Sequence, residues 1–152
     1  MRLCEAQERP WLAVLEQARA KSEAAKDEVE KALREELDYL PKKEHRRKQT
    51  EYTERARRAE RRARTEALDH ALQLAGLWYR DLACVKAGVP ELAFHSDRTT
   101  ELEQDAGNQD PQALVTAQEL VDDTRARLIL NVSEELACEA LAYRLEETLS
   151  AS

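Results

Sequence analysis

The chain is poor in the residues that interrupt helices. Its 152 residues include 3 glycines and 4 prolines, and aromatic side chains make up 5% of the sequence. This scarcity argues against a fold built from many turns, and no stretch alternates β-branched or aromatic residues with polar ones as a half-buried strand does. A core must therefore consist mainly of leucine, alanine and valine.

Cysteines and long apolar runs are also scarce. The three cysteines, Cys4, Cys84 and Cys138, are odd in number and widely spaced, which is typical of reduced thiols and not of a disulfide framework. The longest apolar runs, such as WLAVL at 11–15, are too short to cross a bilayer, and the acidic N-terminus lacks the apolar segment of an export signal. We therefore expect a cytoplasmic protein without a membrane partner.

Charged residues are abundant and make up 36% of the sequence. Leucine and alanine are also common. Alanine, leucine, glutamate, arginine and lysine are the strongest helix formers. Apolar residues at helical spacing, together with the positions of proline and glycine, predict helices over 10–40, 42–87 and 111–130. A short helix is predicted to end at Ala106, and a last helix is predicted after Ser133. The predicted class is all-α, a helical bundle preceded by a long charged helical arm.

Several residues mark the expected helix ends. Pro41 should break or kink the first helix, because the residue before a proline is pushed out of the α region. Gly88 suits the position just past a helix end. Asp110 and Ser133 are candidate N-caps.

The loop at 89–97 separates two of these helices. Leu92 and Phe94 are expected to fold back onto the bundle. Ser96 or Asp97 is expected to cap the short helix that follows.

The charge is distributed unevenly. Residues 42–64 hold 11 basic and 4 acidic residues, whereas residues 65–152 hold 6 basic and 17 acidic ones. We therefore divide the chain into a charged arm or linker at 1–64 and a helical bundle at 65–150.

The basic run has more than one interpretation. Arg57, Arg58, Arg61 and Arg62 are candidates for contact with nucleic-acid phosphates. Tyr52 is the only aromatic residue nearby, so a base-stacking site is not expected. The favoured interpretation is a solvated helix face, and a third is docking on an acidic neighbouring protein.

A wide apolar stripe follows the basic run. Trp78 and Tyr79 are expected to anchor either the core or a subunit contact. Arg80 and Asp81 are interpreted as an ion pair between helices or toward a partner, or as solvated surface residues. The candidate core or interface residues are Leu68, Leu72, Trp78, Tyr79, Arg80, Asp81, Leu82 and Leu141.

The second half of the chain resembles a known family. The pieces that carry the resemblance are YRDL at 79–82, the pair Asn131 and Val132 at an expected helix break, and LACEAL at 136–141. They resemble the C-terminal collar domain of bacterial DNA polymerase III delta-prime subunits, which belong to the clamp-loader family. The similarity is strongest over about 65–148. The segment back to about residue 37 is similar to the basic linker helix of actinobacterial members.

The resemblance implies an all-helical collar that packs against the collars of neighbouring subunits. The chain is then expected to be a non-catalytic assembly module of a clamp loader, within a DNA-directed DNA polymerase holoenzyme that acts in DNA replication. Its partners would be gamma/tau-like and delta-like subunits. The alternative is a stand-alone helical scaffold, or a weak non-specific nucleic-acid binder acting through residues 42–64.

No pattern for catalysis or cofactor binding accompanies the resemblance. Family members carry an ATPase-fold module before the collar, but this sequence has no G-x-x-x-x-G-K-[ST] phosphate loop, so neither ATP binding nor enzyme activity is expected. His95, Ser96 and Asp97 are the residue types of a hydrolase triad, yet adjacent residues cannot converge in that geometry. The histidines and cysteines lack zinc-ligand spacing, so no metal or other cofactor is expected.

Overall fold

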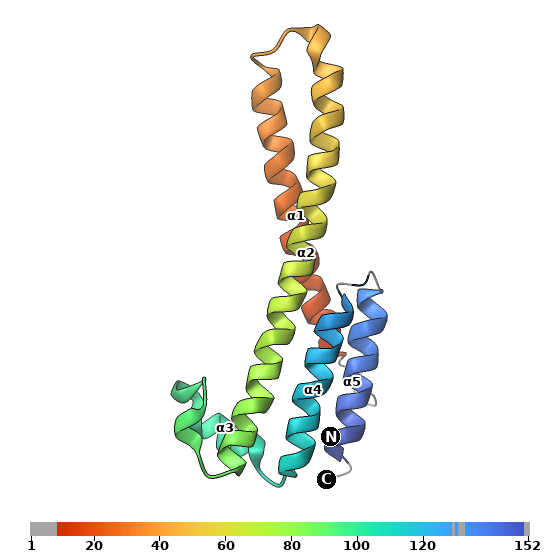
Figure 1. The fold of residues 1–152 in the computed structure, drawn as a ribbon. Coiled ribbons are helices and arrows are strands. Elements are labelled where there is room, and N and C mark those ends of the chain that lie inside the picture. The colour runs from red at the N-terminus through yellow and green to blue at the C-terminus, as the bar shows by residue number, and fades with distance from the viewer. Residues whose placement is uncertain (1–8, 129, 131–132, 151–152) are drawn as a thin grey trace. The chain divides into compact units, whose positions relative to one another are not determined.

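The computed structural model describes residues 9–128, 130 and 133–150. Its elements are α1 (Pro10–Leu37), α2 (Lys42–Lys86), the short 3-10 helices η1 (Pro90–Leu92) and η2 (Ser96–Arg98), α3 (Thr99–Ala106), α4 (Pro111–Leu128) and α5 (Glu134–Ser150) (Figure 1). No strand occurs among these residues, so the predicted all-α class is confirmed. Cys4 and the helix break expected at Asn131 and Val132 lie outside the described residues.

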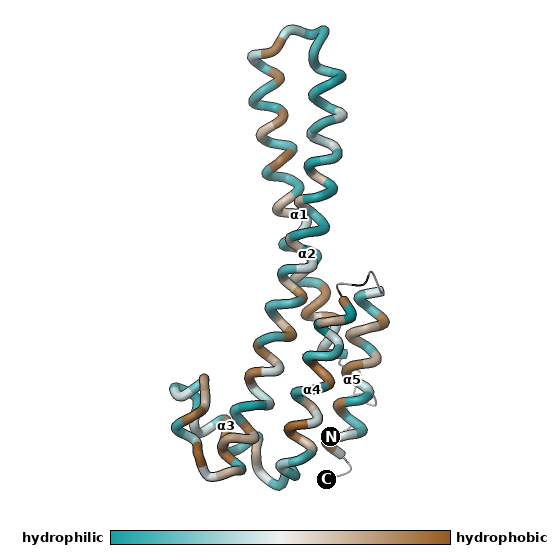
Figure 2. Tube along the Cα trace, viewed as in Figure 1, coloured by the Kyte–Doolittle hydropathy of each residue, from teal (hydrophilic) through white to brown (hydrophobic). Residues whose placement is uncertain are grey.

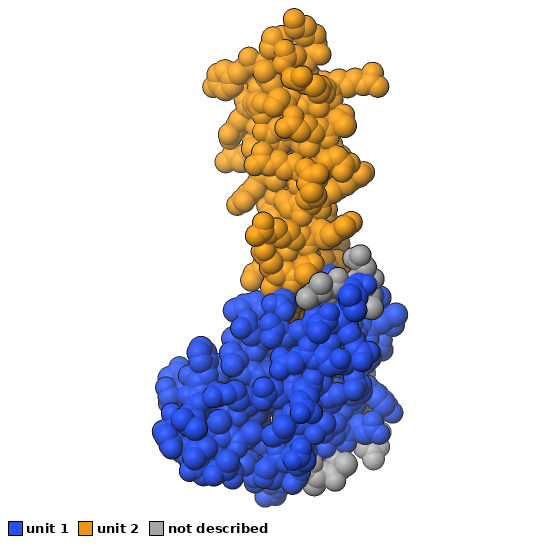
Figure 3. Space-filling view, in the orientation of Figure 1, with its two compact units in different colours: residues 1–12, 69–152 blue, residues 13–68 orange. Residues whose placement is uncertain are grey.

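The chain forms two compact units, and the boundary between them within α2 lies between Leu68 and Asp69 (Figure 3). Unit 1 comprises residues 1–12 and 69–152, and unit 2 comprises residues 13–68. The division within α2 falls close to the boundary that the charge distribution placed after residue 64. Residues 9–12, which were expected in the arm, group with unit 1.

Unit 2 is a helical hairpin made of most of α1 and the first half of α2 (Figure 1). Few apolar residues lie along the contact between its two helices. Hydrophilic residues make up most of the first half of α2 (Figure 2). Tyr52 and Ala56 are buried. The hydroxyl of Tyr52 donates a hydrogen bond to Glu36 on α1, and the Lys48 ammonium lies 2.8 Å from the same carboxylate. Polar links between the two helices therefore supplement a small apolar seam.

Unit 1 packs the second half of α2 with α3, α4 and α5. One buried cluster joins α2, α4 and α5 through Leu72, Leu120, Val121 and Leu141. A second joins α2, α3 and α4 through Leu82, Leu102, Ala106 and Leu114. Tyr79 packs against both clusters, so this part of α2 is the common wall of the core.

The end of α2 has the expected glycine. Gly88 has a φ of 75°, which L side chains rarely adopt. The N–H groups of Val89 and Gly88 donate to the carbonyls of Cys84 and Val85, at 3.0 and 3.1 Å. These paired bonds satisfy the last carbonyls of α2 and turn the chain out of the helix.

Three other predicted helix ends are confirmed and one is wrong. α1 ends before Pro41, and Asp110 and Ser133 cap α4 and α5 through hydrogen bonds from backbone N–H groups at 2.9 and 3.5 Å. Neither Ser96 nor Asp97 caps α3. Both lie inside η2, which runs directly into α3, and the residue that precedes α3 makes no side-chain capping bond.

Candidate functional site

A buried carboxylate lies beneath the loop between α2 and α3. Asp81 has no exposed surface, and its oxygens accept hydrogen bonds from the backbone N–H groups of Phe94 and His95, each at 2.9 Å. The Nδ1 atom of His95 lies 2.7 Å from Oδ2 of Asp81. A carboxylate removed from water needs such donors, and two consecutive residues supply all three.

Arg80, the neighbouring residue on α2, holds the same loop at a second point. Its guanidinium lies 3.2 Å from a carboxylate oxygen of Asp81 and 3.3 Å from the carbonyl oxygen of Leu92. The ion pair of Arg80 and Asp81 thus forms within one helix, and the interpretation of Asp81 as a solvated surface residue is wrong. Sequence reasoning missed this burial, because two of the donors to Asp81 are backbone N–H groups, which carry no residue signature.

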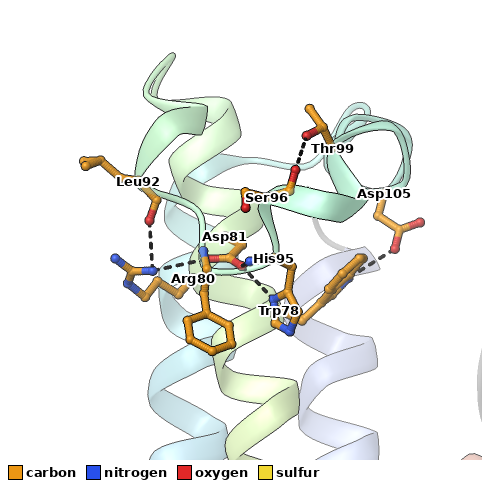
Figure 4. A network of polar contacts seen from close by, with 9 residues as sticks. Trp78, Arg80, Asp81, Leu92, His95, Ser96, Thr99 and Asp105 are labelled. Atoms are coloured by element: carbon orange, nitrogen blue, oxygen red, sulfur yellow. Dashed lines mark hydrogen bonds and ion pairs between the residues drawn. The ribbon is translucent and has the colours of Figure 1, made fainter.

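Aromatic rings surround His95. Its ring lies edge-on to Trp78, with 5.4 Å between ring centroids, and to Phe94, at 5.2 Å. Trp78 in turn donates from Nε1 to Asp105 on α3 at 3.1 Å (Figure 4). The guanidinium of Arg98 lies 5.6 Å from the ring centroid of Trp78. The loop is therefore bonded to α2 through the Leu92 carbonyl, the Phe94 and His95 N–H groups and the His95 ring.

Two opposing effects set the pKa of Asp81. Burial acts to raise it, because a charged group loses its hydration. The hydrogen bonds from the His95 and Phe94 backbone and from the His95 ring stabilise the carboxylate, and together they bring the pKa below its ordinary value of 3.8. Asp81 is therefore ionised at neutral pH.

The loop presents two apolar side chains to solvent. Leu92 is 59% exposed and Phe94 is 66% exposed. The expectation that both fold back onto the bundle is wrong. The backbone N–H of Phe94 is bonded to Asp81, so the buried carboxylate anchors the chain at this residue while its side chain stays in water.

The paired Asp81 and His95 have the geometry of a carboxylate that orients an imidazole, so a catalytic role must be considered. Such a role needs a nucleophile at the other ring nitrogen. Among the described residues, no serine, threonine or cysteine side chain is hydrogen-bonded to the Nε2 atom of His95. No group of three histidine, cysteine or carboxylate side chains suited to a metal ion occurs in the same described ranges.

The other candidate residues of the apolar stripe fall into two groups. Leu68, Leu72, Leu82 and Leu141 are buried, so they are not open to a partner. Trp78, Tyr79 and Arg80 are partly buried. Burial raises the pKa of Tyr79, with a smaller contribution from Asp105.

The four candidate arginines of the basic arm are all exposed on α2. Arg57 lies 3.2 Å from Glu54, and Arg62 lies 2.7 Å from Glu66. Arg58 and Arg61 form no ion pair with any residue that the structure describes. Their i, i+3 spacing places them on one face of the helix.

Within the described helices, none combines the length and the apolar character needed to span a membrane. No protein-family model, curated protein or solved structure matches the chain.

Proposed function

We propose that the chain is a non-catalytic assembly module of a DNA polymerase III clamp loader, similar to a delta-prime collar, and that it acts in the cytoplasm by binding gamma/tau-like and delta-like subunits. The likeness of YRDL at 79–82 and LACEAL at 136–141 to that family supports the proposal. So does the core of unit 1, where the buried residues of both clusters lie on α2, α3, α4 and α5.

One observation carries the proposal: the loop between α2 and α3 is hydrogen-bonded to Arg80 and Asp81 while its largest apolar side chains, Leu92 and Phe94, are exposed. A fixed loop loses little conformational entropy on binding, so an exposed aromatic residue on it is suited to anchor a protein contact. The buried Asp81 supplies that fixation without contacting the partner itself.

A pair of variants tests this role. In Leu92→Ala/Phe94→Ala, the affinity for purified gamma/tau-type and delta-type subunits, measured by biolayer interferometry, is expected to fall ~10–100-fold, as for loss of an interface anchor. Tyr39→Ala is the matched control, because Tyr39 is a 91% exposed aromatic residue in unit 2. Equal binding by both variants and the unaltered chain would refute the role of the loop. No binding of either subunit by the unaltered chain would refute the clamp-loader assignment.

A second candidate function rests on the basic arm. Arg58 and Arg61 are exposed and form no ion pair within the described residues, and the surrounding segment 42–64 is rich in arginine and lysine. Such a surface binds nucleic-acid phosphates weakly and without sequence preference.

A further inference from the structure

α5 has apolar residues on two faces. Cys138, Leu141 and Ala142 are buried within unit 1. Leu136 and Tyr143 are 65% and 63% exposed. Ala140 lies between these two in sequence and is also exposed. Leu136, Ala140 and Tyr143 have the i, i+4, i+7 spacing of a second helix face. This second face has no partner among the described residues.

A groove runs beside that face, between α4 and α5. Its volume is about 390 Å³. Its apolar lining consists of Leu136, Ala137, Ala140 and Leu141. The small side chains of Ala137 and Ala140 allow another backbone to approach this part of the groove closely. Along α5 the lining extends from Ser133 to Arg144, or about 17 Å at ~1.5 Å per residue. That length accommodates about three turns of a helix at ~5.4 Å each.

The charges that line the groove have one sign. Arg127 on α4 and Arg144 on α5 are its only charged lining residues among those described. Both approach the single carboxylate of Asp123, at 2.9 and 3.7 Å. One carboxylate cannot neutralise two guanidinium groups, so the two lining arginines and Asp123 together carry one net positive charge. An occupant of matching charge must carry carboxylates.

We propose that this groove binds an acidic amphipathic helix of a partner protein. This inference rests on the proposed assembly function. Apolar side chains of the bound helix would lie over Ala137 and Ala140, and its carboxylates would lie beside Arg127 and Arg144. A second copy of this chain fits less well. If a two-fold axis passed through the groove, it would bring the two arginines against their own equivalents.

Two synthetic peptides and two variants test the groove in the full chain. Both peptides are helical, with leucine at i, i+4 and i+7. One carries glutamate and the other lysine on the flanking positions. The glutamate peptide is expected to bind about tenfold more tightly in fluorescence anisotropy, as for complementary charge at an interface. Ala140→Arg should abolish its binding, because the long side chain fills the groove from an exposed helix position. Arg127→Gln/Arg144→Gln should remove the preference for glutamate over lysine. Circular dichroism confirms that both variants fold.

The outcomes separate this proposal from the assembly function. Binding of gamma/tau-type and delta-type subunits that Ala140→Arg leaves unchanged would overturn the groove and leave the assembly function standing. Glutamate-peptide binding that Ala140→Arg abolishes would support the groove even if neither subunit binds. No preference between the two peptides overturns the proposal. A dimer of the unaltered chain that Ala140→Arg dissociates would also overturn it, since the occupant would then be a second copy.

Discussion

The Nδ1 atom of His95 lies 2.7 Å from Oδ2 of Asp81, 14 residues earlier in the chain. The same carboxylate accepts hydrogen bonds from the backbone N–H groups of Phe94 and His95. These bonds fix the loop after α2 to the helix itself, beneath the two apolar side chains that the loop exposes.

Asp81→Asn should destabilise unit 1. The substitution keeps the size of the side chain but removes its charge and turns an NH2 group toward backbone donors. Hydrogen bonds to a charged group contribute more than neutral ones, so we expect a loss of about 2–3 kcal/mol. Urea denaturation measures the loss, and amide hydrogen exchange at Phe94 and His95 should accelerate.

Asp105→Asn is the matched control for this change. Asp105 is exposed and accepts one hydrogen bond from Trp78, which an asparagine oxygen can also accept. Its effect should stay below about 0.5 kcal/mol, as for most surface substitutions. Equal destabilisation by both variants would contradict the special role of Asp81.

The lowered pKa of Asp81 predicts how stability depends on pH. The unfolded chain, with the ordinary value of 3.8, takes up the proton more readily than the folded chain. The contribution of Asp81 is therefore present above about pH 4 and is lost as the pH falls through the folded-state pKa. Urea titrations from about pH 6 to pH 2 should give a shallower slope of stability against pH for Asp81→Asn than for the unaltered chain. An unchanged slope would mean that this carboxylate is not stabilised by folding.

The helices themselves could be predicted from the sequence because their signals are local. Gly88, Asp110 and Pro41 act on the backbone within a few residues, and the apolar spacing of α2 and α4 repeats along one face. The buried state of Asp81 could not be predicted in this way. An aspartate beside an arginine on a helix is usually solvated, and its donors are backbone groups that carry no residue signature.

The positions of Leu92 and Phe94 show a second limit. Apolar residues in a loop are expected to seek the core, and hydropathy alone favours that placement. Here the backbone N–H groups of the loop point toward Asp81, and the side chains of Leu92 and Phe94 remain exposed. The histidine in HSD was the available clue, since it could pair with a carboxylate on α2, but sequence spacing does not identify which one.

Substitution by alanine should change stability in opposite directions at Gly76, inside α2, and at Gly88, just after its end. Gly88 has a φ of 75° and no atom within 4 Å of an added Cβ, so the cost of Gly88→Ala is conformational, about 1 kcal/mol. Gly76 lies inside the helix, and its added Cβ would meet Val121 at an ordinary 3.5 Å. Gly76→Ala should therefore stabilise by about 0.5–1 kcal/mol through helix propensity. Thermal denaturation of both variants measures the two signs, and a loss of stability in Gly76→Ala would show that α2 and α4 pack too tightly there.

The basic arm should bind duplex DNA weakly, through phosphates alone. We expect a dissociation constant in the non-specific range of ~10⁻⁴–10⁻⁶ M, with no dependence on sequence and a steep fall in affinity with salt, because each neutralised phosphate releases counterions. Arg58→Glu/Arg61→Glu should reduce the affinity at least about tenfold more than the control Lys21→Glu/Lys31→Glu, which changes the net charge equally on exposed positions of α1. Fluorescence anisotropy with two unrelated duplexes at several salt concentrations measures these effects. Equal losses in the two variants would assign the binding to net charge and not to residues 42–64. Tight binding to one duplex only, without binding to clamp-loader subunits, would contradict the assembly function as well.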